Sequence, residues 1–92
     1  MNVKAHIFIT GRVEGVFFRS NTRNEAKKQH VNGWVRNLHD GRVEAIFEGR
    51  KEDVDKLIDF ASKGPSGAKV IDLNIKWESY DGKFDDFEII YF

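Results

Sequence analysis

The segment GRVEGVFFR, residues 11–19, combines two glycines, two phenylalanines and an arginine. Gly11 and Gly15 tolerate backbone conformations that other residues avoid, so several N–H groups of the segment can point to one centre. Successive N–H groups ahead of a helix bind anions, helped by the positive end of the helix dipole. The guanidinium of Arg19 can hold two phosphate oxygens at once. These residues therefore predict a cradle for one small tetrahedral anion.

The same segment also fits a purely structural role. It contains neither the GxxxxGK[ST] pattern of nucleotide-binding loops nor the GxGxxG pattern of dinucleotide-binding domains. In the structural interpretation the glycines space a strand-to-helix turn, the phenylalanines pack inside, and the arginine is solvated. The residues of this segment alone leave both interpretations open.

The cradle requires a strand before it and a helix after it, and the flanking sequence predicts both. Residues 3–10 (VKAHIFIT) are rich in β-forming residues and alternate in polarity, which predicts a strand. Residues 20–30 are polar and contain no proline, which predicts a helix. Its candidate N-cap residues are Ser20, Asn21 and Thr22. A narrow buried stripe is predicted along Phe18, Thr22 and Ala26.

A hairpin and a second helix are predicted in the middle of the chain. Residues 34–38 and 43–47 alternate in polarity and flank Asp40-Gly41, a pair typical of a hairpin with a type I′ turn. Residues 51–63 carry apolar side chains with helical periodicity, and Gly64-Pro65 ends that helix.

Two further strands are predicted at residues 70–77 and 87–92. The order β-α-β-β-α-β with an added terminal strand is typical of an α+β, ferredoxin-like sandwich, in which an antiparallel sheet carries both helices on one face. We therefore predict a single domain over residues 1–92. This fold hosts binding proteins as well as enzymes, so it does not decide the function.

The composition disfavours several classes of function. Fifteen Lys and Arg residues balance fifteen Asp and Glu residues, so the chain lacks the basic field expected of a nucleic-acid or anionic-membrane binder. It contains no cysteine, which excludes disulfides and fits a reducing cytoplasm. No stretch approaches the roughly 18 apolar residues that span a bilayer. We expect a cytoplasmic monomer with no nucleic-acid or membrane partner.

Three motifs of the chain resemble those of the acylphosphatase family. GRVEGVFFR at 11–19 is similar to that family's G-x-V-Q-G-V-x-F-R, GWVRN at 33–37 to its G-W-V-x-N, and DGRVE at 40–44 to its D-G-x-V-E. The likeness continues in order to the Phe87-Glu88-Ile89 ending and so covers nearly the whole chain. The first two motifs are specific, so the resemblance favours the anion cradle over the plain turn.

The resemblance implies an enzyme that hydrolyses the carboxyl-phosphate bond of a small acyl phosphate, giving a carboxylate and inorganic phosphate without a metal or cofactor. It implies that Arg19 is the catalytic arginine and that Asn37 orients the attacking water. The family's phosphate loop falls on Gly11, Arg12, Val13, Glu14, Gly15, Val16, Phe17 and Phe18. A carboxylate with a pKa of about 4 leaves without a general acid, and inorganic phosphate is expected as product and inhibitor.

Two positions depart from the family pattern. Glu14 stands where the family usually has Gln, and a carboxylate facing inward would repel a phosphate. We therefore expect the Glu14 side chain to point outward. Ile90 stands where the family often has Arg, which removes any salt bridge from that position.

Two other classes of function remain open. A non-catalytic ferredoxin-like module would use the loop to bind a small anion or a protein without turnover. An RNA-binding sheet is less favoured, because RVEAIFEG at 42–49 lacks the paired aromatic residues of RNA-recognition motifs. The histidines have no metal-ligand spacing, and we expect surface or sheet positions for His6, His30 and His39.

Overall fold

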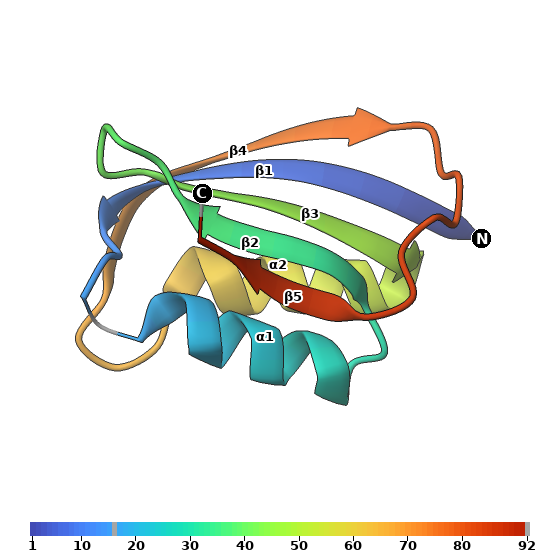
Figure 1. Ribbon diagram of the computed structural model, residues 1–92, viewed down its shortest axis with the longest axis horizontal. Coiled ribbons are helices and arrows are strands. Elements are labelled where there is room, and N and C mark those ends of the chain that lie inside the picture. The colour runs from blue at the N-terminus through green and yellow to red at the C-terminus, as the bar shows by residue number, and fades with distance from the viewer. Residues whose placement is uncertain (16, 92) are drawn as a thin grey trace.

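The computed structural model describes residues 1–15 and 17–91, and in this part of the chain the element order is the predicted one (Figure 1). Both helices cover one face of a five-stranded sheet, and the other face carries no helix (Figure 1). The elements are β1 (Asn2–Arg12), α1 (Phe18–Lys28), β2 (Asn32–Asn37), β3 (Val43–Arg50), α2 (Lys51–Lys63), β4 (Lys69–Glu78) and β5 (Phe87–Ile90).

The sheet has the strand order β4-β1-β3-β2-β5. Its first four strands pair antiparallel, as a ferredoxin-like sandwich requires, but β5 pairs parallel with β2. The four strands of the predicted ferredoxin-like sandwich are thus antiparallel as expected, and the added terminal strand, whose direction the sequence did not indicate, makes the sheet mixed. The reason is the connection after β4, which crosses the end of the sheet where β4 stops and β2 starts (Figure 1). A strand that begins there has to run in the direction of β2.

The hydrophobic core lies between the sheet and the two helices. The strands contribute alternate residues to it, because side chains along a strand point to opposite faces, and the helices contribute one stripe each. As predicted, α2 spans residues 51–63, with Val54, Leu57 and Ala61 fully buried. The stripe predicted on the first helix is also buried, and its largest side chain, Phe18, anchors α1 to the sheet.

The start of α1 differs from the prediction. The helix begins at Phe18, and its N-cap residue is Phe17, which has left-handed backbone angles (φ 59°, ψ 28°) and no side-chain cap. The polar residues expected at the cap instead lie in the first turn, where Ser20 Oγ and Asn21 Nδ2 donate hydrogen bonds to the Phe17 carbonyl oxygen. The aromatic pair of the loop therefore forms the helix start.

The turn between β2 and β3 is not the type I′ turn that Asp40-Gly41 predicted. Of the three loop residues at 39–41, only Gly41 has a positive φ, of 93°. The Gly41 N–H donates to the Leu38 carbonyl oxygen at 3.2 Å, and the Leu38 N–H donates to the Arg42 carbonyl oxygen at 2.8 Å. This is a three-residue hairpin loop, in which a regular turn is followed by a left-handed glycine.

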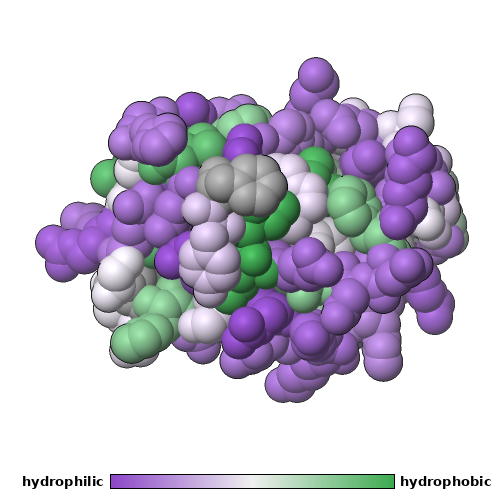
Figure 2. Space-filling view, viewed as in Figure 1, coloured by the Kyte–Doolittle hydropathy of each residue, from purple (hydrophilic) through white to green (hydrophobic). Residues whose placement is uncertain are grey.

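The surface on the side shown in Figure 1 is mainly hydrophilic, with a narrow apolar strip near the centre of the view, over β5 (Figure 2). Neither helix in the described part of the chain is long and apolar enough to cross a membrane.

Candidate active site

The topology brings the predicted loop and the end of β2 to the same end of the sheet. The strands β1, β2 and β5 end there, and β3 and β4 begin there. The helix α1 also starts at this end, directly after the loop that follows β1 (Figure 1). Segments far apart in the sequence, namely residues 13–15 and 17–19, Asn37 and Tyr91, therefore share one corner of the molecule.

The two glycines of GRVEGVFFR have different roles. Gly11 lies within β1 opposite Val70, where the β1–β4 pairing shifts register. A Cβ at Gly11 would lie 2.0 Å from the Lys69 carbonyl oxygen, so glycine is required there for the close approach of β4. Gly15 has open space around it, with no atom within 4 Å of a Cβ, but its φ is +76°. Of these two positions, Gly15 requires glycine for its backbone angle alone, whereas Gly11 also requires it for close packing.

The loop carries a second left-handed residue at Phe17, with φ 59° and 79% of its surface exposed. Bulky residues rarely adopt positive φ, and such residues cluster at functional sites. Left-handed residues next to helical ones turn neighbouring N–H groups to one side, which is the geometry of anion-binding backbone nests. Val16, which completes the predicted cradle, lies outside the described residues.

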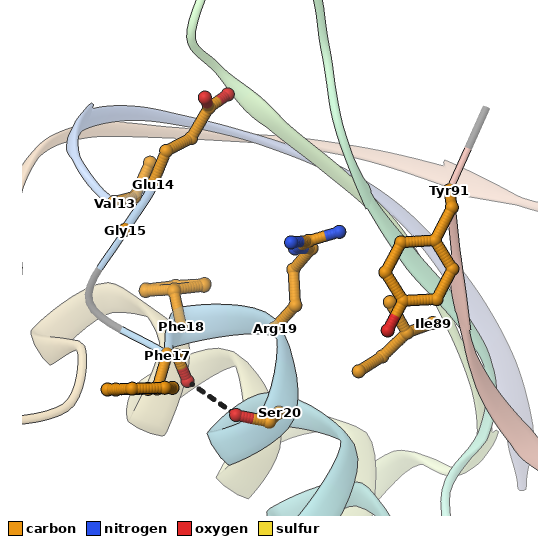
Figure 3. Close-up of a pocket in the computed structure, with 9 residues that line it drawn as sticks. All are labelled: Val13, Glu14, Gly15, Phe17, Phe18, Arg19, Ser20, Ile89 and Tyr91. Atoms are coloured by element: carbon orange, nitrogen blue, oxygen red, sulfur yellow. Dashed lines mark hydrogen bonds between the residues drawn. The ribbon is translucent and has the colours of Figure 1, made fainter.

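A cavity of about 330 Å³ opens between this loop, the first turn of α1 and the end of β5 (Figure 3). It is lined by six residues of the predicted loop and arginine, and by three others: Val13, Glu14, Gly15, Phe17, Phe18 and Arg19, then Ser20, Ile89 and Tyr91. Gly11 and Arg12 of the predicted loop do not line it, because they belong to β1 and pair with β4. No pattern in the sequence predicts a pocket wall from β5, because that wall depends on the pairing of β5 with β2.

Arg19 points from α1 into the space between the loop and Tyr91 (Figure 3). Its guanidinium carbon lies 5.2 Å from the centroid of the Tyr91 ring. None of the carboxylates in the described part of the chain forms an ion pair with it. The positive charge of Arg19 therefore lies beside the loop with no carboxylate of residues 1–15 or 17–91 paired to it.

Asn37 is the last residue of β2 and pairs with Val43 of β3. It lies two residues beyond the buried Val35, and so on the same face of the sheet, toward the helices. It does not line the cavity. Its side-chain oxygen Oδ1 is buried and accepts no hydrogen bond from the described residues. Buried polar atoms are rarely left unpaired in proteins, so this oxygen is an acceptor suited to a small donor such as water.

The side chain of Glu14 is exposed at the rim of the cavity. Figure 3 shows its carboxylate pointing out from the loop and not toward Arg19. Glu14 forms no ion pair with the described residues. The outward orientation that we expected from the sequence is the one observed.

A polar network that the sequence did not predict lies on the helix-free face of the sheet. Glu44 of β3 accepts a hydrogen bond from His6 Nε2 at 2.6 Å and pairs with Arg36 at 2.7 Å, while His6 Nδ1 contacts Glu78 at 3.2 Å. Burial raises the pKa of Glu44, but the hydrogen bonds from His6 and Arg36 outweigh that effect and hold its pKa below the ordinary value. The network links side chains of β1, β2, β3 and β4. Its member in β2, Arg36, directly precedes Asn37.

Comparisons with known proteins identify the family. The sequence profile of the acylphosphatase family matches residues 5–89. An acylphosphatase of Syntrophus aciditrophicus is 54% identical over 99% of this chain and 95% of its own, and one of Pyrobaculum calidifontis is 55% identical over 96% and 81%. The crystal structure of acylphosphatase from Bacillus subtilis has a TM-score of 0.93 at 32% identity, covering 97% of this chain and 99% of that one. This chain, whose glycine loop and Arg19 line one cavity, therefore belongs to the acylphosphatase family, whose members hydrolyse acyl phosphates.

Proposed function

We propose that the chain hydrolyses acyl phosphates by direct attack of water on phosphorus, with the phosphate bound between the loop and Arg19. The observation that carries this proposal is the cavity in which the left-handed loop, the start of α1 and the Arg19 guanidinium meet. A phosphoryl group there would receive N–H donors from the loop and the positive end of the α1 dipole. Arg19 would neutralise the charge that builds up on its oxygens.

We assign to Asn37 the role of orienting the attacking water. The buried Oδ1 of Asn37, which has no hydrogen-bond partner among the described residues, can accept a hydrogen bond from that water, and its amide nitrogen can donate one. Orienting one water in line with the breaking bond is what this reaction requires of the protein. The water oxygen bonds to phosphorus, the phosphorus–oxygen bond to the acyl group breaks, and its electron pair leaves with the carboxylate. The proton of the water passes to a phosphoryl oxygen.

The reaction as proposed needs neither a metal nor a cofactor. Its leaving group is a carboxylate with a pKa of about 4, so no acid has to protonate it at neutral pH. The remaining negative charge lies on the phosphoryl oxygens, which the loop and Arg19 contact. Inorganic phosphate presents the same oxygens, and we expect it to bind the same cradle and inhibit.

The proposed site lies within one chain. All residues assigned to it belong to the loop, α1, β2 and β5, so turnover would not require a second copy. We accordingly propose that residues 1–92 act as one domain and as a monomer. The absence of cysteine from the sequence supports a place in the reducing cytoplasm.

The test is turnover of benzoyl phosphate, followed by ultraviolet absorbance, in the presence of a chelator. We expect turnover by the parent, competitive inhibition by inorganic phosphate, and a loss of at least about a thousandfold in kcat/KM for Arg19→Ala and Asn37→Ala, the scale of removing a main transition-state contact. Both variants should keep the parent's circular dichroism spectrum, because Arg19 and Asn37 are only partly buried and neither belongs to the hydrophobic core.

Two outcomes would contradict the proposal. Turnover by either variant close to the parent's would remove that residue from the mechanism. Phosphate binding without any turnover by the parent would instead support a non-catalytic anion-binding module.

A further inference from the structure

Tyr91 lies just beyond β5 and 78% of its surface is exposed. An aromatic ring that is this exposed gains little from core packing. It nevertheless lines the cavity, and its ring faces the Arg19 guanidinium carbon at 5.2 Å (Figure 3). The ring of this exposed residue is therefore placed over the proposed phosphate-binding arginine.

The backbone of Tyr91 is fixed by the strand before it. Ile90 of β5 pairs with Arg36 of β2, and Ile89 packs against the hydrophobic core. The residue that follows Ile90 is Tyr91, and the residue that follows Arg36 is Asn37. The parallel strand β5 therefore delivers one side chain to the corner that contains both proposed catalytic residues.

A long side chain such as arginine needs a partner to stay in one orientation. A carboxylate would supply that orientation, but it would also cancel the charge that a phosphate requires. An aromatic face attracts a guanidinium through its quadrupole and leaves the net charge unchanged. Tyr91 is such a partner, and its hydroxyl makes no hydrogen bond to the described residues.

We propose that Tyr91 is a positioning residue, whose ring holds the Arg19 guanidinium toward the loop while its positive charge stays available for phosphate. This inference rests on the proposed function, in which Arg19 contacts the phosphoryl oxygens. The ring is the required part of the side chain, and the hydroxyl is dispensable. A cation–π contact at an exposed site corresponds to about a two- to fivefold change in phosphate affinity.

Three substitutions of Tyr91 separate the ring, the hydroxyl and the charge. Tyr91→Phe keeps the ring, and we expect its inhibition constant for inorganic phosphate to stay within about twofold of the parent's. Tyr91→Leu removes the ring, and we expect that constant to rise about two- to fivefold, with KM for benzoyl phosphate rising in step. Tyr91→Glu offers Arg19 a carboxylate, and we expect weaker phosphate binding than in Tyr91→Leu, since the arginine charge is then compensated.

The matched control is Tyr80→Leu, which replaces a partly exposed tyrosine in the connection between β4 and β5, at the other end of the sheet (Figure 1). It should leave phosphate inhibition unchanged. A second readout is the ring-current shift of the Arg19 side-chain protons in NMR spectra. We expect that shift in the parent and in Tyr91→Phe, and its loss in Tyr91→Leu, which a purely structural role of Tyr91 would not predict.

The inference is overturned if Tyr91→Leu binds inorganic phosphate as the parent does, or if Tyr91→Glu binds it as well as Tyr91→Phe. It is also overturned if the Arg19 signals of Tyr91→Leu match those of the parent. Failure of the proposed function gives a different result, namely no turnover of benzoyl phosphate by the parent. Phosphate binding and the Arg19 signals still test the inference in that case.

Discussion

Replacing Gly11 by alanine should break the pairing of β1 with β4, whereas Gly15→Ala should leave the fold nearly intact. A Cβ at residue 11 would lie 2.0 Å from the Lys69 carbonyl oxygen and 2.9 Å from the Ile71 nitrogen. Both are backbone atoms and cannot rotate away. Ordinary contact begins at 3.4 Å, so the strands would have to separate by about 1.4 Å, the difference between 3.4 and 2.0 Å.

The two costs differ in size. Around Gly15 nothing lies within 4 Å of the added Cβ, so only the left-handed conformation is penalised, by about 1–2 kcal/mol. The lower entropy of the unfolded alanine chain offsets about 0.4–1 kcal/mol of that, which leaves a net loss of about 1 kcal/mol. Gly11→Ala adds lost ladder hydrogen bonds to backbone strain, and we expect more than about 3 kcal/mol. That is a large share of a stability of about 5–15 kcal/mol.

Urea unfolding followed by tryptophan fluorescence measures both free energies. Gly15 lines the cavity and Gly11 does not, so Gly15→Ala should raise KM for benzoyl phosphate in a protein that is still folded. Gly11→Ala should lower the urea midpoint far more. Equal losses of unfolding free energy in the two variants would refute the assignment of close packing to Gly11 and of backbone angle to Gly15.

Two further predictions concern carboxylates. Glu44→Gln should lower the free energy of unfolding at pH 7 by about 2 kcal/mol, because it weakens the charged contacts to His6 and Arg36. The pKa of Glu44 is lowered in the fold from an ordinary value of 4.5, so this stability is complete above pH 4.5 and is lost as pH falls through the folded-state pKa. The gap between parent and variant in urea titrations should close over that range, and a gap that widens there would contradict the argument. Glu14→Gln should lower KM for benzoyl phosphate about two- to threefold at low ionic strength, with the gain vanishing in about 1 M salt. A salt-independent change in KM would show that repulsion by Glu14 is not the cause.

The parts of the fold that depend on local pattern could be predicted from the sequence. The bounds of α2 follow from its helical periodicity and from Gly64 after it, whose φ is +74°. The start of α1 could not be predicted in the same way. Its N-cap is the left-handed Phe17, a conformation that propensity disfavours and that the packing of Phe18 against the sheet makes possible. The hairpin loop at residues 39–41 is not the predicted type I′ turn, because an Asp-Gly pair fits both a two-residue turn and a three-residue loop. The sequence does not distinguish between these two loops.

The sequence by itself determined the chemistry available to this protein: backbone donors from a glycine loop, a fixed positive charge at Arg19 and a neutral amide at Asn37. It also determined the order of the helices and strands, because side-chain periodicity is local. The tertiary structure alone decided which of the loop residues line the cavity, left Asn37 Oδ1 without a hydrogen-bond partner among the described residues, and placed Tyr91 against Arg19. Those contacts depend on the register between strands that are distant along the chain, and above all on the parallel pairing of β5 with β2. No local pattern of residues encodes that pairing, since it follows from which end of the sheet the last connection crosses.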